Sequence, residues 1–198
     1  MTPRIEPLGD EALRVALPDG VDRAGALSRL RGIAGVVDVT MAEAHAAILF
    51  AGAPPASAVI EAALRGGAVG GAAPREVTLV ARYDGPDLAR VAAWAHCSVT
   101  EVVERHVGRV YTARYLGFLP GFAYLGDVDP RIAAPRLPAP RARVEAGHVG
   151  IAGARTGVYP AASPGGWNLV AFVEDFIGWT PDAGPLLRPG DRVRFVPR

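Results

Sequence analysis

Nine consecutive residues, 66–74, carry no side chain larger than valine and read GGAVGGAAP. Side chains this small cannot build a packed element, and such a composition is typical of a linker. The sequence therefore predicts two domains, an N-terminal one over residues 1–66 and a C-terminal one over residues 75–198. Residues 67–74 are the predicted linker between them.

The N-terminal segment has the periodicities of a small α+β domain. Alternation of apolar and polar residues predicts strands over residues 12–17, 36–40 and 46–50. Helical spacing predicts one helix over residues 21–33. A second helix is predicted to begin at Pro54 and Pro55, because proline is tolerated in the first turn. The order β-α-β-β-α favours a ferredoxin-like sandwich.

The C-terminal segment is predicted to be rich in strands and turns. It begins with a strand over residues 76–83, and two short helices follow between residues 87 and 106. Ser98 and Glu101 form a capping box, which predicts the start of the second helix. After residue 111 no helical period is seen, and Gly and Pro are frequent. A Pro-Gly turn before an alternating last strand is typical of a small closed barrel.

The composition excludes several functions. The chain has no lysine, so all 21 of its basic residues are arginine, and its formal net charge is +1. Schiff-base chemistry and a P-loop lysine are therefore excluded. Any bound carboxylate or phosphate would be held by arginine, backbone N–H groups or hydroxyls. Glu101 and Glu104 beside Arg105 leave the second short helix without a basic face, so nucleic acid is not an expected partner.

Neither a membrane partner nor a metal site is expected. No window approaches 18 consecutive large apolar residues, and the first residues lack the pattern of a secretory signal. The single cysteine, Cys97, fits a reducing compartment, so we expect a cytoplasmic protein. No two histidines have metal-ligand spacing. His106 is predicted to end a helix, where the helix dipole favours a cation.

The glycine- and proline-rich segments after residue 116 concentrate aromatic rings and arginines. They read GFLPGFAYLG at residues 117–126, PR at 135–136 and 140–141, GHVGIAG at 147–153, TGVYP at 156–160 and SPGGWN at 163–168. Such runs fix the backbone at many points while placing side chains on loops. One interpretation is a turn-rich barrel whose aromatic residues are core. The other is a rigid-walled pocket for a small acid or amide.

The pocket interpretation names two groups of substrate-binding residues. The predicted aromatic walls are Phe122, Tyr124, Tyr159 and Trp167. The predicted polar anchors are Arg136, Arg141 and Asn168. No residue is predicted to act as a catalytic base or nucleophile.

The motifs GFLPGFAYL, PR and PR, AGHVGIAGARTGVYP, SPGGWNLV and LLRPGDRVRFVP follow one another over about residues 75–198. In this order they resemble the family of the 5-oxoprolinase B subunit, also described as allophanate hydrolase subunit 1-like, which includes the KipI-type kinase inhibitors. The run ARYDGPDL with the later helical His106 also resembles this family, which adds His106 to the substrate-binding candidates. The chain departs from the family at Glu145, His148, Arg155 and residues 170–173.

The resemblance implies an α+β fold, with a cyclophilin-like β-barrel following a small ferredoxin-like domain. It implies an enzyme component, inactive alone, that works with a C-type partner (allophanate hydrolase subunit 2-like) and an A-type partner of the LamB/YcsF type. Together these would hydrolyse 5-oxoproline, a lactam, to glutamate, with ATP held by the complex and not by this chain alone. Two alternatives are an allophanate hydrolase-like amidohydrolase component and a KipI-like inhibitor of a histidine kinase.

Overall fold

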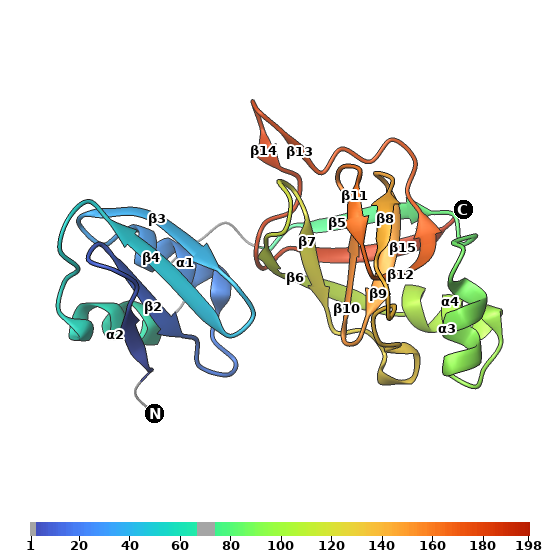
Figure 1. The fold of residues 1–198 in the computed structure, drawn as a ribbon, viewed down its shortest axis with the longest axis horizontal. Helices are drawn as coiled ribbons and strands as arrows, with labels where there is room; N and C mark the ends of the chain where they lie inside the picture. Colours follow the sequence, from blue (N-terminus) through green and yellow to red (C-terminus); the bar gives the residue numbers. More distant parts are fainter. Residues whose placement is uncertain (1–2, 67–73) are drawn as a thin grey trace. The chain divides into compact units, whose positions relative to one another are not determined.

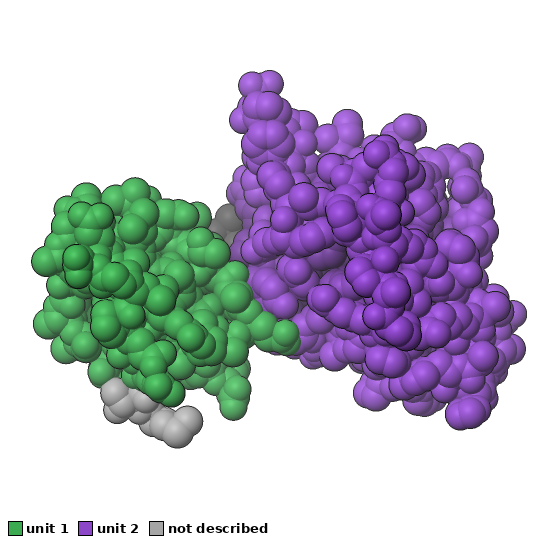
Figure 2. All heavy atoms as spheres, in the orientation of Figure 1, with its two compact units in different colours: residues 1–73 green, residues 74–198 purple. Residues whose placement is uncertain are grey.

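The structure is a computed structural model of the chain, in which residues 3–66 and 74–198 are described. The chain divides into two compact units, residues 1–73 and residues 74–198 (Figure 2). Residues 67–73 of the predicted linker lie outside the described residues.

The first unit is a four-stranded antiparallel sheet with two helices (Figure 1). Its elements are β1 (Ile5–Pro7), β2 (Ala12–Ala16), α1 (Arg23–Arg31), β3 (Val36–Met41), β4 (His45–Phe50) and α2 (Ser57–Arg65). The strand order is β1-β2-β4-β3. Apolar residues of both helices, such as Leu30 and Ile60, pack in one core with strand residues such as Val15 and Ile48.

The predicted β-α-β-β-α order is present in the first unit, with two differences. The sequence pattern missed β1, a three-residue strand that pairs with β2 at the sheet edge. Helix α2 begins at Ser57, after both prolines, and Ala56 at its N-cap is extended. Pro55 disfavours helical backbone at Pro54, so the helix is not expected to begin at that residue. The ferredoxin-like assignment stays a prediction.

The second unit contains a seven-stranded sheet in the order β12-β9-β10-β7-β6-β15-β5. These strands are β5 (Glu76–Ala81), β6 (Val110–Leu116), β7 (Ala123–Gly126), β9 (His148–Ala152), β10 (Arg155–Val158), β12 (Asn168–Phe172) and β15 (Arg192–Pro197). Only the β5–β15 pair is parallel among the described pairs. Arg82, just after β5, exchanges two backbone hydrogen bonds of 2.8 Å with Phe172 of β12. This bridge joins the two sheet edges, so the sheet is nearly closed into a barrel.

Shorter elements complete the second unit. They are α3 (Leu88–Trp94), α4 (Val99–Val107), the 3₁₀ turn Pro130–Ile132, and the strand pairs β8 (Arg141–Val144) with β11 (Ser163–Gly165) and β13 (Trp179–Thr180) with β14 (Gly184–Pro185). Both helices lie at one end of the sheet (Figure 1). The predicted capping box is confirmed, because the Glu101 backbone N–H donates to Ser98 Oγ and the Glu101 carboxylate accepts from the Ser98 N–H.

Two apolar clusters are present in the second unit. The larger one contains the buried residues of α3, α4 and most of the strands. The smaller one, Phe122, Val144, Tyr159, Trp167 and Leu169, contains three of the predicted aromatic wall residues. In the described part of the chain, no helix is both long and apolar enough to span a bilayer.

Candidate functional site

A cavity of about 260 Å³ lies beside the smaller cluster, and we call it the aromatic pocket. Its lining residues are Phe118, Phe122, Tyr124, Arg136, Pro140, Tyr159, Pro164, Gly165, Gly166 and Trp167. Five of the eight predicted site residues therefore line one cavity: Phe122, Tyr124, Arg136, Tyr159 and Trp167. Sequence reasoning missed Phe118, although it belongs to the same GFLPGF run.

Glycine explains how bulky rings fit against this sheet. Gly150 of β9 and Gly157 of β10 are cross-strand partners. A Cβ at Gly150 would lie 2.9 Å from Cβ of Trp167, and a Cβ at Gly157 would lie 3.2 Å from the Phe122 ring. The first contact is shorter than real Cβ contacts and the second is tighter than most of them, so Trp167 and Phe122 occupy space that a larger residue at either position would need. The glycines noted in the sequence are thus what places the aromatic walls.

The rings hold one another in fixed orientations. The Phe122 ring meets Tyr124, Tyr159 and Trp167 edge-on, with centroid distances of 5.0, 5.5 and 5.3 Å. Such perpendicular contacts are favourable for aromatic quadrupoles and add to the burial of the rings. Phe118 also meets Phe122 edge-on, but it is 57% exposed and has a left-handed backbone with φ of 73°. The pocket therefore has a rigid inner wall and one exposed ring among its lining residues.

Arg136 is the charged group of the aromatic pocket. No hydrogen bond or ion pair joins its guanidinium to another of the described residues, and the residue is exposed. Burial raises the pKa of both Tyr124 and Tyr159, and the nearby Arg136 opposes this rise in each case. The tyrosines therefore stay neutral, and the arginine keeps its five N–H donors available for a ligand.

Asn168 lies outside the lining of the pocket. It is completely buried, and its Nδ2 donates to the backbone oxygens of Pro135 (2.9 Å) and Ile151 (3.0 Å). Its Oδ1 accepts from Arg90 Nε at 3.0 Å. These contacts tie the chain before β8 to the sheet, so the expected role of Asn168 as a ligand anchor is not supported by its position.

Arg141, the second arginine of the two Pro-Arg pairs, also lies outside the pocket lining. Its Nη2 donates to Oδ1 of the buried Asp87 at 2.7 Å. The two arginines thus differ although their local sequences are alike. Arg136 has no partner among the residues that the structure describes, whereas Arg141 is paired with Asp87.

His106 belongs to the main core and not to the pocket. It is fully buried, with Nδ1 2.6 Å from the Tyr83 hydroxyl and Nε2 3.0 Å from Thr156 Oγ1. Burial lowers the pKa of His106 to about 3, so the ring is neutral near pH 7. The expectation of a cation at the end of this helix was wrong, because the side chain points into the core and loses its hydration. Its position also gives no support to substrate binding.

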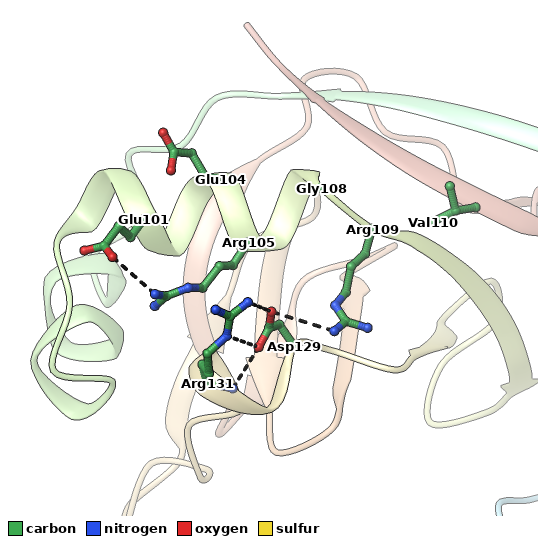
Figure 3. A pocket seen from close by; sticks show the side chains of 8 residues that line it. All are labelled: Glu101, Glu104, Arg105, Gly108, Arg109, Val110, Asp129 and Arg131. Atoms are coloured by element: carbon green, nitrogen blue, oxygen red, sulfur yellow. Dashed lines mark hydrogen bonds and ion pairs between the residues drawn. The ribbon is translucent and has the colours of Figure 1, made fainter.

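A second cavity, of about 700 Å³, was not predicted from the sequence, and we call it the charged cavity (Figure 3). Its lining residues are Glu101, Glu104, Arg105, Gly108, Arg109, Val110, Asp129 and Arg131. They come from α4, the start of β6 and the 3₁₀ turn, which are separated in the sequence. Only the run DPR at residues 129–131, with its capping aspartate, could have marked part of it.

The guanidinium groups of the charged cavity are each matched by a carboxylate. Arg131 donates to both oxygens of Asp129 (3.0 and 2.7 Å), and Arg109 lies 3.7 Å from the same carboxylate. Arg105 donates to Glu101 at 3.2 Å. Hydrogen bonding by Arg131 holds the pKa of Asp129 well below its usual range. The charged cavity is therefore an ion-pair network in which each of the three arginines meets a carboxylate, and Arg109 and Arg131 share Asp129.

The positions where the sequence departs from the family all lie outside the pocket lining. Glu145 pairs with Arg143, His148 meets the Phe172 ring edge-on, and Arg155 donates to Asp127. Residues 170–173 are three buried residues and one partly buried one on or just after β12. None of these positions is therefore a wall of the aromatic pocket.

The second unit is a barrel-like domain that carries the aromatic pocket, and comparison with known proteins assigns the chain to a family. The sequence profile of the family described as "Carboxyltransferase domain, subdomain C and D" matches residues 3–181. The chain therefore belongs to this family. Its resemblance to the B subunit of 5-oxoprolinase is confirmed, since curated relatives 40–50% identical to it carry that name.

Three proteins illustrate the similarity. The chain is 50% identical over 117 residues to the 5-oxoprolinase B subunit of Escherichia coli O157:H7, covering 58% of this chain and 53% of that protein. It is 47% identical over 114 residues to the 5-oxoprolinase B subunit of Bacillus subtilis (strain 168), covering 57% and 47%. The chain thus spans about half the length of these relatives. The crystal structure of TTHA0988 superimposes with a TM-score of 0.80 at 33% identity, covering 95% of this chain and 40% of that one.

Proposed function

We propose that the chain is the B-type component of an ATP-dependent 5-oxoprolinase, which hydrolyses 5-oxoproline to glutamate with C-type and A-type partners. The names of the similar proteins support this assignment. The chemistry of the aromatic pocket supports it independently.

The observation that carries the proposal is Arg136, which lies beside aromatic walls and is unpaired within the described part of the chain. A lactam with a carboxylate presents one anionic group and one small, nearly flat ring. An arginine fork suits the carboxylate, and aromatic faces suit the ring. The volume of about 260 Å³ lies just below the range of pockets for drug-sized ligands, which fits a ligand of this small size.

The residues of this chain would bind and orient the lactam. The Arg136 guanidinium would hold the carboxylate, and the neutral hydroxyls of Tyr124 and Tyr159 would hydrogen-bond the ring amide. The buried rings of Phe122 and Trp167 would exclude water from one face of the ligand. None of these groups is assigned as a base or a nucleophile.

The charged cavity does not fit ATP. Its three arginines, the groups that could contact phosphates, are already paired with Glu101 and Asp129 (Figure 3). The chain also has no lysine for a phosphate-binding loop. We therefore assign ATP binding to the partner proteins of the complex.

The proposal is tested by reconstitution. The chain, its C-type partner and its A-type partner should together release glutamate from 5-oxoproline only when ATP is added. Arg136→Ala should raise KM by about 10- to 100-fold, since a hydrogen bond to a charged group contributes about 1.5–3 kcal/mol. Arg143→Ala is the control, because Arg143 is an exposed arginine paired with Glu145. Absence of glutamate release with all three proteins and ATP would reject the proposal.

A further inference from the structure

We propose that Asp87 is a positioning residue for the aromatic pocket. Its carboxylate joins the two chain segments that carry different parts of the pocket lining, through Leu169 on one side and Arg141 on the other. The inference rests on the proposed function only for the identity of the ligand. The geometry that carries it concerns the protein alone.

The first attachment is to β12. The Asp87 backbone N–H donates to the Leu169 carbonyl at 2.9 Å, and the Leu169 N–H donates to Asp87 Oδ2 at 2.7 Å. Both residues are buried. Leu169 lies two residues after Trp167, so this reciprocal pair fixes the backbone immediately after the pocket tryptophan.

The second attachment is to β8. Arg141 Nη2 donates to Asp87 Oδ1 at 2.7 Å, and Arg141 is the register partner of Gly165 on β11. Pro140, next to Arg141, and Gly165 both line the pocket. The carboxylate of Asp87 therefore holds the strand pair β8–β11 at a set distance from β12, and with it the space between Gly165 and Trp167.

The Asp87 side chain does not make the hydrogen bond that its position at the start of a helix predicts. It occupies the N-cap position of α3, where an aspartate ordinarily accepts a hydrogen bond from the first turn. Its side chain makes no such bond. The carboxylate instead has one oxygen for Leu169 and one for Arg141, so its two acceptors serve the pocket segments and not the helix.

The attachment to Arg141 depends on one hydrogen bond. Nη1 of Arg141 is buried and has no hydrogen-bond partner, while Nη2 makes the contact with Asp87. A lysine ammonium can supply a single charged donor, and it would remove the unpaired Nη1. Arg141→Lys should therefore keep the attachment, whereas Arg141→Ala should lose it.

The test uses Trp167 as the reporter. Trp94 and Trp179 are each 44% exposed, and replacing both with phenylalanine leaves Trp167 as the single tryptophan. In this background, Asp87→Asn and Arg141→Ala should at least double the rate constant for acrylamide quenching of Trp167 fluorescence. Arg141→Lys should stay near the parent value. Asp84→Asn is the matched control, because Asp84 lies in the same turn, is exposed and pairs with Arg82.

A ligand measurement completes the test. Affinity for 5-oxoproline should fall about 10-fold in Asp87→Asn and Arg141→Ala and recover in Arg141→Lys. Unchanged quenching in Asp87→Asn, or equal behaviour of Arg141→Lys and Arg141→Ala, would overturn the inference. If Asp87→Asn does not fold, the comparison of Arg141→Lys with Arg141→Ala tests the inference instead. If Arg141→Ala also fails to fold, the role of this contact is purely structural and the inference is overturned. Because quenching needs no ligand, this result is independent of the Arg136→Ala result.

Discussion

The aromatic pocket and the charged cavity both contain arginine, and they differ in what the arginines contact. In the charged cavity, Arg105, Arg109 and Arg131 meet carboxylates of the same chain. In the aromatic pocket, Arg136 stands beside apolar rings with no partner among the described residues. The larger cavity is therefore the one whose arginines are already paired with carboxylates. Cavity volume alone is a poor guide to a ligand site, and the state of the polar groups separates the two.

The largest effect is expected from filling the space under the aromatic wall. Gly150→Ala would place a Cβ 2.9 Å from Cβ of the buried Trp167. Overpacking of this kind should lower the free energy of unfolding by up to about 3 kcal/mol. Urea denaturation measures it. Gly166→Ala is the control, since its Cβ would make an ordinary 3.6 Å contact with Pro140. Equal stability of the two variants would show that the aromatic wall does not need Gly150.

The next effect is a loss of stability at low pH, caused by the buried His106. The two cavities can be compared only at a pH at which the protein stays folded. The pKa of His106 is about 3 in the folded protein, against 6.5 for an ordinary histidine. Between these two pH values the imidazole is protonated in the unfolded chain and neutral in the folded chain. Stability is therefore complete above about pH 6.5 and falls as the pH drops towards 3. The expected loss at pH 5 is about 2 kcal/mol relative to pH 7.

Denaturation of His106→Gln checks this prediction. The variant should lose the His106 contribution to the pH dependence, while the exposed His96→Gln should keep the profile of the parent protein. A His106→Gln profile as steep as that of the parent between pH 7 and 5 would contradict the assignment of a neutral buried imidazole.

The smallest effect is expected in the charged cavity. Asp129→Asn weakens the ion pair with Arg131, whose side chain is 66% exposed and therefore well screened by solvent. Stability should fall by about 1 kcal/mol or less, and affinity for 5-oxoproline should not change. Calorimetric titration measures the affinity. A loss of affinity as large as that in Arg136→Ala would instead make the charged cavity the ligand site and reverse the comparison.

Local features of the sequence predicted several elements of the fold. Two examples are the capping box at Ser98 and Glu101 and the alternation in residues 12–17. Each involves only residues close together in the sequence, so each can be recognised from the sequence alone. The four aromatic residues that the sequence grouped together do line one cavity, and the glycines that make room for them stand in the same motifs. The strand β1 was missed because three residues are too few to show a period.

The polar part of the site could not be predicted to the same extent. Arg136 and Arg141 both follow proline, and only the fold brings Asp87 to Arg141 from 54 residues away. Likewise, His106 lies in the last turn of a helix that could face solvent, and its contacts with Tyr83 and Thr156 are set by the fold. Contacts between residues distant in the sequence determine which polar groups are paired within the protein. The polar groups left without such a contact are the ones available to a ligand.

The most direct test of the central claim compares two ligands on the same protein. By NMR titration of the full chain, 5-oxoproline should bind more tightly than 2-pyrrolidone, which is the same lactam without the carboxylate. Arg136→Ala should abolish this preference, and Arg143→Ala should retain it. Equal binding of the two lactams by the parent protein, or a preference that survives in Arg136→Ala, would contradict the account.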